Sequence, residues 1–393
     1  MKRMQRLLLS LTAFAVLFSF CQLSVAGSQD KAKYKYFWKY ATLAPDGMGW
    51  SKHMKDVIFP VMNSFTRGEL YVKTYWGGVM GDEEDYIRKI RIGQLQGAGL
   101  SAQGTVMVCP EMSVLEMPFL FRDYYEVDYI RVKMDRVFDE VFNRQKIFLV
   151  GWIDQDFDQV YSSKYPMETL ADFSKSRFLT WYGTMEQEML KTLGADAVPI
   201  NVPEAATAFR QGMGDAAIAP GIMIIATQLQ SRFRYVNTMK IRYSPATIIQ
   251  TMASLNELPA EYRKDFYVQR LELGWRYSNL VRKDNEKYLQ ALINYGIRPA
   301  KMTPQALEEI KAKVKGINHK VVGALFSQKL LDTLNGHLAD FRSGRRLTRA
   351  DLIEFARLDP SKITPQELKG IEDRIRKGLK EFGYAEGSLV KLD

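Results

Sequence analysis

The feature that most constrains the fold is a change of pattern along the chain. Over residues 34–243, short runs rich in β-branched and aromatic residues alternate with longer runs of helical period. Such alternation is typical of an α/β fold. After Pro259 the chain is almost wholly helical, and one helical period runs from Glu261 to about Tyr295. A helix of that length, roughly 50 Å at the usual rise per residue, is long enough to cross between two lobes.

Capping residues set the expected ends of several helices. Asp82 is expected to cap one helix. Two capping boxes, Thr348 with Asp351 and Thr364 with Glu367, predict a helical hairpin near the C-terminus. The expected strands are 34–41, 69–75, 97–100, 146–152, 177–182, 215–220 and 234–243, and the expected helices before the hairpin are 49–66, 82–94, 125–145, 184–193, 203–210, 261–295 and 303–316.

The first 26 residues have the three parts of a secretory signal peptide. Basic residues at positions 2, 3 and 6 precede an apolar stretch, 7–20, and small residues follow at 24–26. The apolar stretch is too short for a stable membrane span. We therefore expect cleavage after Ala26 and a periplasmic mature protein. Lipidation of Cys21 is the alternative, which the bulky residues at 18 and 20 disfavour.

Length and composition exclude several classes of protein. A chain of 393 residues can form two or three domains with full cores. Its 46% hydrophobic and 25% charged residues are typical of soluble globular proteins, which excludes collagenous, disordered and multi-span membrane classes. The net charge of +10 falls to +7 without residues 1–26, which hold three basic and no acidic residues. The basic residues are interleaved with acids, so a nucleic-acid partner is not expected. With Cys109 as its one cysteine, the mature chain cannot form an internal disulfide.

No catalytic or metal-binding set is recognisable in the sequence. His53, His319 and His337 have no second His, Cys or Glu at metal-ligand spacing. Residues 99–104 miss the Gly-x-Ser-x-Gly spacing of a nucleophile elbow, and the chain has no Gly-Lys-Ser/Thr phosphate loop. We therefore expect no enzymatic activity, no metal and no cofactor.

The strongest candidate for a metal or ligand site is a run of three aspartates, Asp154, Asp156 and Asp158. In an extended segment they would share one face. A calcium loop would need a glycine and a glutamate where Gln159 and Tyr165 stand. The favoured interpretation is a polar strand end at the rim of a lobe, and contact with a ligand is the alternative.

Tryptophans mark the expected binding region. Five of the six fall at strand ends or strand–helix junctions, where open α/β sheets bind ligands. Trp50, Trp152 and Trp181, together with Phe157, gather around two expected crossover points. At least two of these four are predicted to line a pocket.

Eight short motifs share their order and spacing with a known family. They are ATLAP at 41–45, GGVMGD at 77–82, the glycines at 93 and 97, LEMPFLF at 115–121, GW at 151–152, LADF at 170–173, LGADAVP at 193–199 and GMGD at 212–215. In this order the chain, from about Tyr36 to Phe341, resembles the periplasmic solute receptors of tripartite ATP-independent periplasmic (TRAP) transporters, of the DctP type. The resemblance implies a two-lobed α/β clamp that closes on a small-molecule ligand and delivers it to TRAP membrane permease subunits.

The same resemblance divides the chain into lobes. It implies a first lobe of residues 34–154 and 243–285, and a second lobe of residues 155–242 and 286–341. A long helix spans both. Residues 342–393 lie beyond the resemblance and are expected to form a C-terminal helical extension, which packs on the body or on a periplasmic protein partner.

Departures from the family pattern suggest the chemistry of the ligand. Leu179 and Asp158 stand where the family has arginines, and Ile218-Ala219-Pro220 replaces its Glu-Asn-Pro. A carboxylate without a cationic partner is costly to desolvate, so we expect a neutral, largely apolar ligand. A cationic ligand facing Asp158, or a sensor or scaffold module that docks a protein, are the alternatives. The candidate ligand-binding residues are Trp50, Gln103, Phe119, Trp152, Phe157, Asp158, Leu179, Trp181, Ala219 and Tyr243.

Overall fold

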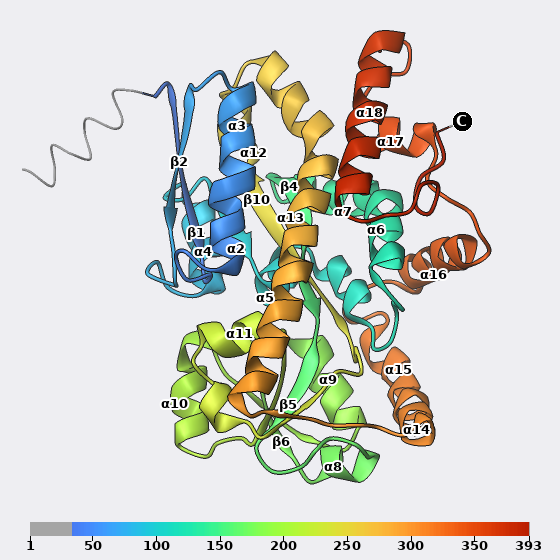
Figure 1. The fold of residues 1–393 in the computed structure, drawn as a ribbon. Helices are drawn as coiled ribbons and strands as arrows, with labels where there is room; N and C mark the ends of the chain where they lie inside the picture. The colour runs from blue at the N-terminus through green and yellow to red at the C-terminus, as the bar shows by residue number, and fades with distance from the viewer. Residues whose placement is uncertain (1–33, 393) are drawn as a thin grey trace, which may run out of the picture.

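The computed structural model describes residues 34–392 and shows two lobes, each built around its own sheet (Figure 1). The first sheet has the strand order β2-β1-β3-β10-β4, and the second has the order β11-β9-β5-β8-β6-β7. The predicted two-lobed α/β fold is confirmed, whereas the predicted signal peptide, 1–26, lies outside the described residues. The strands are β1 (Tyr36–Thr42), β2 (Leu70–Tyr75), β3 (Gly97–Leu100), β4 (Ile147–Phe157), β5 (Gln159–Ser162), β6 (Arg177–Thr180), β7 (Asp196–Pro199), β8 (Ala216–Ala219), β9 (Tyr235–Asn237), β10 (Tyr243–Thr251) and β11 (Arg298–Pro299).

Strand β10 lies between β3 and β4 in the first sheet, where the sequence predicts no strand beyond residue 243. The structure divides the expected strand 234–243 between β9, in the second lobe, and β10, which pairs antiparallel with both of its neighbours. All but the last residue of β10 are buried, so the strand lacks the alternation of a half-exposed one. Pro245 lies at a shift of register, where a strand tolerates proline.

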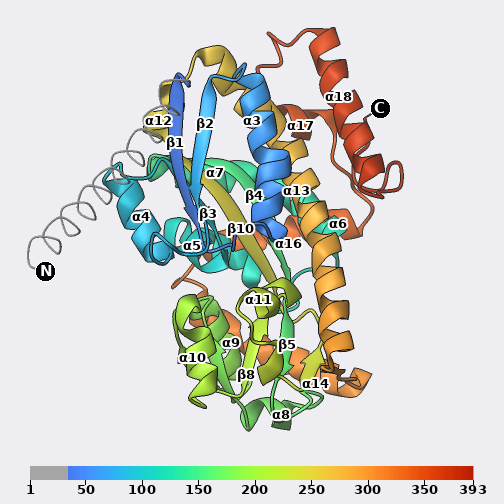
Figure 2. The ribbon, with the colours of Figure 1, turned by 60° about the vertical axis from the view of Figure 1, so that its left-hand side comes forward.

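The chain crosses between the lobes at four places, the last of which, residues 322–327, leads to α16 (Gln328–Arg342). β4 continues into β5 through Asp158, and residues 238–242 connect β9 to β10. The third crossing is helix α13 (Ala260–Tyr295), which runs along both lobes (Figures 1 and 2). This helix confirms the predicted long helical period. It begins after Pro259 and ends at Gly296, whose φ of +118° favours glycine.

The helices expected in the first lobe are present with two differences, and the structure adds helices at 102–108, 110–116 and 252–256 that were not predicted. A π-helical turn, η1 (Met54–Ile58), interrupts the expected helix 49–66, and the expected helix 125–145 is two helices that meet at Met134. Asp82 caps α4 as predicted, since its carboxylate accepts a 3.0 Å hydrogen bond from the Asp85 N–H. The helices are α2 (Gly49–His53), α3 (Phe59–Phe65), α4 (Glu83–Arg91), α5 (Ala102–Val108), the 3₁₀ helix η2 (Pro110–Glu116), α6 (Tyr124–Lys133), α7 (Asp135–Arg144) and α12 (Met252–Asn256).

The helices of the second lobe come from two parts of the chain. α14 and α15, which follow α13, pack against α8 and α9. No helix among the described residues is both long and apolar enough to span a membrane. The helices of this lobe are α8 (Leu170–Ser174), α9 (Thr184–Thr192), η3 (Val202–Glu204), α10 (Ala205–Arg210), α11 (Gly221–Ala226), η4 (Gln230–Arg232), α14 (Pro304–Val314), η5 (Lys315–Ile317) and α15 (Asn318–Val321).

The chain returns to the first lobe earlier than the sequence suggests. Helix α16 (Gln328–Arg342), which falls in the range expected for the second lobe, packs against α6 of the first lobe (Figure 1). Arg342 Nε donates a 2.7 Å hydrogen bond to the Glu126 carboxylate. The extension then forms α17 (Arg349–Phe355) and α18 (Pro365–Glu381), and both helices begin at the predicted capping boxes.

Candidate functional site: the cleft between the lobes

A cavity of about 400 Å³ lies between the two lobes. The first lobe supplies the ends of β1 and β3, the loop after β2 and parts of α2, β4, β10 and α13, and the second lobe supplies the turn after β6 together with η3, α10 and α11. Ligands of open α/β sheets bind at such strand ends. The wall consists of Thr42, Leu43, Ala44, Pro45, Trp50, Met54, Gly77, Gly78, Glu83, Gly99, Leu100, Ser101, Ile153, Gln155, Tyr182, Val202, Pro203, Ala206, Met223, Ala226, Thr227, Ala246, Ile248 and Tyr277.

Glu83 is the only carboxylate among the described residues that line the cavity, and it is already engaged. It accepts hydrogen bonds from the backbone N–H and the hydroxyl of Ser101, and from the Gly104 N–H at 2.9 Å. Burial raises its pKa. Gly104 lies so close that a Cβ there would be 2.8 Å from the Glu83 carboxyl carbon. Glu83 therefore joins α4 to the start of α5 and has no oxygen free of such bonds.

Gln155, Tyr182 and Met223 connect the two walls. Gln155 Oε1 accepts a 2.8 Å hydrogen bond from the Ala102 N–H, and its Nε2 donates to the Tyr182 hydroxyl at 3.4 Å. That hydroxyl in turn lies 3.4 Å from Met223 Sδ. The Gln155 backbone carbonyl accepts from Asn285 of α13 at 2.8 Å. These polar groups are thus used within the protein, at the point where the lobes meet.

Three further side chains of the wall use their hydroxyl groups within the protein. The Thr227 hydroxyl donates to a backbone carbonyl at 2.7 Å, the Tyr277 hydroxyl donates to the Trp50 carbonyl at 3.0 Å, and Thr42 Oγ1 accepts from a backbone N–H at 3.3 Å. The indole N–H of Trp50 is buried and has no hydrogen-bond partner in the described part of the chain.

No Lys, Arg or His of the described chain lines the cavity, but one arginine lies behind its wall. The Arg242 guanidinium carbon is 4.2 Å from the centroid of the Tyr182 ring. Arg242 Nε donates to Asp158 at 2.7 Å, and its Nη2 donates to Ser244 at 2.6 Å and lies 3.9 Å from Glu116. The charge of this fully buried arginine is therefore neutralised within the protein.

The surroundings of Arg242 hold more carboxylates than one guanidinium can neutralise. Burial raises the pKa of Glu116 to about 8 and that of Glu186 to about 7. Glu186 also accepts hydrogen bonds from the backbone N–H groups of Trp181 and Tyr182, at 3.1 and 2.9 Å. This buried cluster thereby fixes the turn that carries Tyr182 into the cleft.

The structure places the ten candidate ligand-binding residues in different surroundings. Trp50 lines the cleft, while Gln103 and Trp181 line a separate hollow of about 250 Å³ that also includes η3. Phe119, half-buried with a φ of +54°, lines neither hollow. The other six are buried and also lie outside both walls: Trp152, Phe157, Asp158, Leu179, Ala219 and Tyr243.

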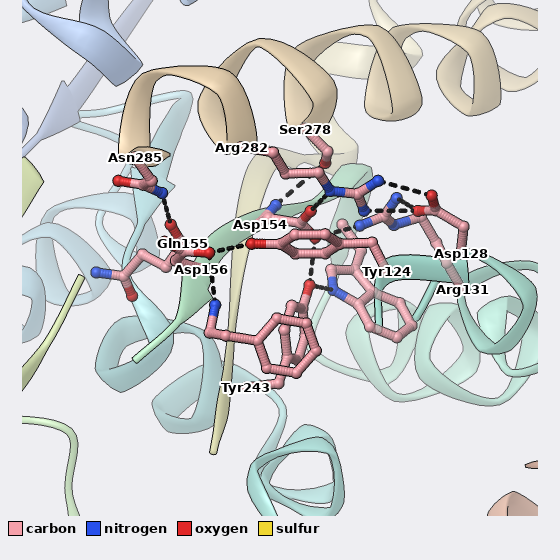
Figure 3. A network of polar contacts seen from close by, with 12 residues as sticks. Tyr124, Asp128, Arg131, Asp154, Gln155, Asp156, Tyr243, Ser278, Arg282 and Asn285 are labelled. Carbon is pink, nitrogen blue, oxygen red and sulfur yellow. Dashed lines mark hydrogen bonds and ion pairs between the residues drawn. The ribbon is translucent and has the colours of Figure 1, made fainter. Parts of the chain in front are cut away.

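The acidic run at 154–158 is buried, whereas the interpretation favoured from the sequence is a polar strand end at the rim of a lobe. β4 includes Asp154 and Asp156, whose carboxylates have partners (Figure 3), and Asp158, which follows the strand, accepts from Arg242. Asp154 accepts from Arg131 and, at 2.6 Å, from Arg282, and Asp156 accepts from the Tyr124 hydroxyl. Among the described residues, no three His, Cys, Asp or Glu side chains are placed to hold a metal ion.

Several residues of the cavity wall could not be identified as ligand-binding candidates from the sequence. Leu43, Val202, Ala206 and Met223 are apolar, and only their tertiary position places them in the cleft. The one local signal is their location next to strand ends and helix starts. Pro203, which the sequence marks as the start of a helix, is itself part of the wall.

Two lobes joined by four crossings, with a cavity between them, define a two-lobed solute-binding protein. The family model of bacterial extracellular solute-binding proteins, family 7 (DctP), matches residues 50–323. The chain belongs to this family. The resemblance found in the sequence is thereby confirmed, as is the prediction of a transport receptor rather than an enzyme.

Two curated relatives illustrate the range of similarity. The 2,3-diketo-L-gulonate-binding periplasmic protein YiaO of Escherichia coli (strain K12) is 22% identical over 252 residues, which are 63% of this chain and 76% of the relative. The C4-dicarboxylate-binding protein DctB of Bacillus subtilis (strain 168) is 23% identical over 171 residues, 43% of this chain and 47% of the relative.

Solved structures share the fold over most of the chain. A TRAP periplasmic solute binding protein from Haemophilus influenzae with bound L-gulonate has a TM-score of 0.70 at 16% identity, and the match covers 77% of this chain and 100% of that one. One from Chromohalobacter salexigens with bound D-glucuronate has a TM-score of 0.68 at 18% identity, with 77% and 99% covered. At these identities the likeness establishes the fold.

Proposed function

We propose that the protein captures a neutral, largely apolar solute in the cleft and delivers it to the permease of a TRAP transporter, as a periplasmic receptor released by cleavage of residues 1–26. The observation that carries the ligand class is the wall of the cavity. Apolar side chains predominate there, and no Lys, Arg or His of the described chain contributes. Such a wall stabilises a ligand by about 25 cal/mol per Å² of apolar surface removed from water.

An acidic ligand would lack a cation in this cleft. Relatives have been solved with L-gulonate and D-glucuronate, both acids. In this chain, the positive charge of Arg242 is bound by Asp158, and Leu179 is buried within the second sheet. Moving a carboxylate from water into such a site without an ionic partner costs several kcal/mol of desolvation free energy.

The alternatives have less support from the structure. A cationic ligand would need a free carboxylate, but Asp158 pairs with Arg242 and Glu83 is held by the start of α5. A protein-docking role for the extension has no specific support, since Leu352, Phe355 and Ile375 are buried against the body of the protein.

A calorimetric screen tests the proposed ligand class. Dicarboxylates, sugar acids and sialic acid are compared with fatty, sterol-like and aromatic neutral compounds. We expect neutral compounds to bind and the simple acids to fail. Micromolar binding of any simple acid by the unmodified protein, with no neutral compound bound, would overturn the proposal.

A matched pair of variants locates the binding site. Ala206→Arg places a guanidinium in the wall, and Ala206→Gln places a similar volume there without charge. We expect both to reduce the affinity for neutral ligands through lost space, and the arginine variant alone to gain affinity for acids. If neither variant changed binding, the ligand would lie outside this cavity.

A further inference from the structure

We infer that the hollow of about 250 Å³ beside the cleft is a second binding site, which takes a small neutral polyol. The site goes beyond the proposed receptor function of the cleft and does not depend on it. Both lobes form the hollow. Gln103 of α5 comes from the first lobe, and the second lobe supplies the turn after β6, part of α9 and the segment from the end of β7 to η3.

Three amide side chains line the hollow, and none of them is used within the protein. The side chains of Gln103, Gln187 and Asn201 have no hydrogen-bond partner in the described part of the chain. Gln103 and Gln187 are half-buried, yet their amide atoms remain open to solvent, and Asn201 is exposed. The hollow therefore offers hydrogen-bond donors and acceptors that a ligand can reach without breaking a contact of the protein.

Glu204 is the one charged side chain that the described chain contributes to the hollow. It is exposed and forms no ion pair with any described residue. An anion bound here would face this carboxylate without a cation to offset the repulsion, and like charges brought together in this way exclude a partner. Sugar acids are therefore disfavoured in the hollow.

The side chains of the hollow require a ligand that both donates and accepts hydrogen bonds. Each amide has an NH₂ donor and a carbonyl acceptor, while the Glu204 carboxylate only accepts. A hydroxyl group donates and accepts, so a polyol can bond to all four side chains. An ammonium group only donates and would leave the amide NH₂ groups without acceptors. A hydrocarbon would displace water from these groups without replacing its hydrogen bonds.

The volume of the hollow limits the size of the ligand. Since a cavity of about 150 Å³ holds benzene, about 250 Å³ holds roughly ten non-hydrogen atoms, the size of a five-carbon polyol. Pro199 and Ile200 add apolar surface to the wall. The CH groups of such a polyol can pack there while its hydroxyl groups bond to the amides.

A matched set of probes tests the inferred ligand class. Xylitol, xylonate and 1-amino-1-deoxyxylitol share one carbon skeleton and differ in charge, while pentane-1,5-diol keeps the skeleton and has fewer hydroxyl groups. Dissociation constants are measured on the mature chain by ligand-observed NMR titration. We expect xylitol to bind about tenfold more tightly than each of the other three, because it alone offers a full set of uncharged hydroxyl groups.

Variants of the wall locate the polyol. Gln103→Leu and Gln187→Leu each remove one amide, from opposite lobes, and each should weaken xylitol binding by about tenfold. Gln211→Leu is the control, because this exposed glutamine of the second lobe lies outside the hollow and the cleft. Ala226→Phe adds a ring to the wall of the cleft alone. Both of these variants should bind xylitol as the unmodified protein does.

Glu204→Gln tests the selection against acids. We expect it to keep xylitol binding and to reduce the preference for xylitol over xylonate, because the amide removes the repulsion. A purely structural role of Glu204 would not change this ratio.

Four results would each overturn the inference: no binding of xylitol, tightest binding of a charged probe, unchanged xylitol binding in both amide variants, or an unchanged preference in Glu204→Gln. Loss of xylitol binding in Ala226→Phe would place the polyol in the cleft and overturn it as well. Thermal melting checks the fold of each variant, and if one amide variant does not fold, the other provides the test. Failure of this site leaves the apolar ligand of the cleft standing, because that proposal is tested with other compounds.

Discussion

At the scale of single residues, the buried carboxylates around Arg242 make the free energy of unfolding depend on pH. Glu116 is fully buried, and burial raises its pKa from 4.5 to about 8. Between these values the folded protein holds a proton on Glu116 that the unfolded chain has released. The stability that this proton contributes is therefore complete below about pH 4.5 and is lost as the pH rises through about 8.

The variant Glu116→Gln should remove this dependence. We expect it to match the unmodified protein near pH 5 and to be more stable at pH 8.5, by several kcal/mol, because the amide never has to ionise. Urea unfolding at several pH values provides the measurement. Glu186, whose pKa is raised to about 7, stays in place and keeps a residual slope. Parallel stability curves for the two proteins would contradict the assignment.

At the scale of elements, the C-terminal extension is part of the first lobe. Arg357 of the extension donates to Asp135 at 2.9 Å and to Asp139 at 3.0 Å, both on α7. Arg270 of α13 donates to the Phe355 carbonyl at 3.0 Å. Because α7 and α13 both contact β4, the extension covers elements that hold the first sheet. This explains how the packing of α17 and α18 stabilises the lobe.

Truncation after Phe341 should destabilise the first lobe. It removes the apolar faces of α17 and α18 and leaves Asp135 and Asp139 with Arg270 as their remaining arginine. We expect a loss of several kcal/mol in the free energy of unfolding. The variant Arg357→Met should show a smaller part of that loss, since it removes the ion pairs and keeps the apolar contacts. An unchanged melting temperature after truncation would show that the extension contributes nothing to stability.

At the scale of the whole molecule, the polar network of Figure 3 joins β4, β10 and α13. Asp154 of β4 accepts from Tyr243 of β10 and from Arg282 of α13. Arg282 also donates at 2.9 Å to Tyr384, a residue of the extension. A buried network of ion pairs and hydrogen bonds is rigid. The bending that closes the cleft is therefore expected beside this network, at Asp158 and at residues 238–242.

Ligand binding should close the two lobes. A ligand shifts the population toward the closed form only if it binds that form more tightly, and the contacts from both lobes to the cavity provide the difference. X-ray scattering with and without a ligand found in the screen should show a smaller radius of gyration when the ligand is bound. The Ala206→Arg variant, given the same neutral ligand, is the control. An unchanged radius at saturation would contradict the clamp.

Much of the fold could be predicted because it depends on local patterns. The long period of α13, the Asp82 cap and the boxes at Thr348 and Thr364 act through neighbouring residues, and the structure contains all of them. Strand β10 is different. Its residues are buried on both faces by elements distant in the sequence, so no alternation marks it.

The sequence by itself determined the class of fold, the long helix and the helix caps. Only the tertiary structure decided which residues line the cleft. Leu179 and Ala219 differ from the family pattern and were therefore candidates for the site, but both are buried beside neighbouring strands. Val202 and Ala206, which were not candidates, line the cleft. The physical reason is that a cavity between lobes is defined by how two surfaces meet. Local propensities fix each helix and strand, but not the surface that it presents to the other lobe.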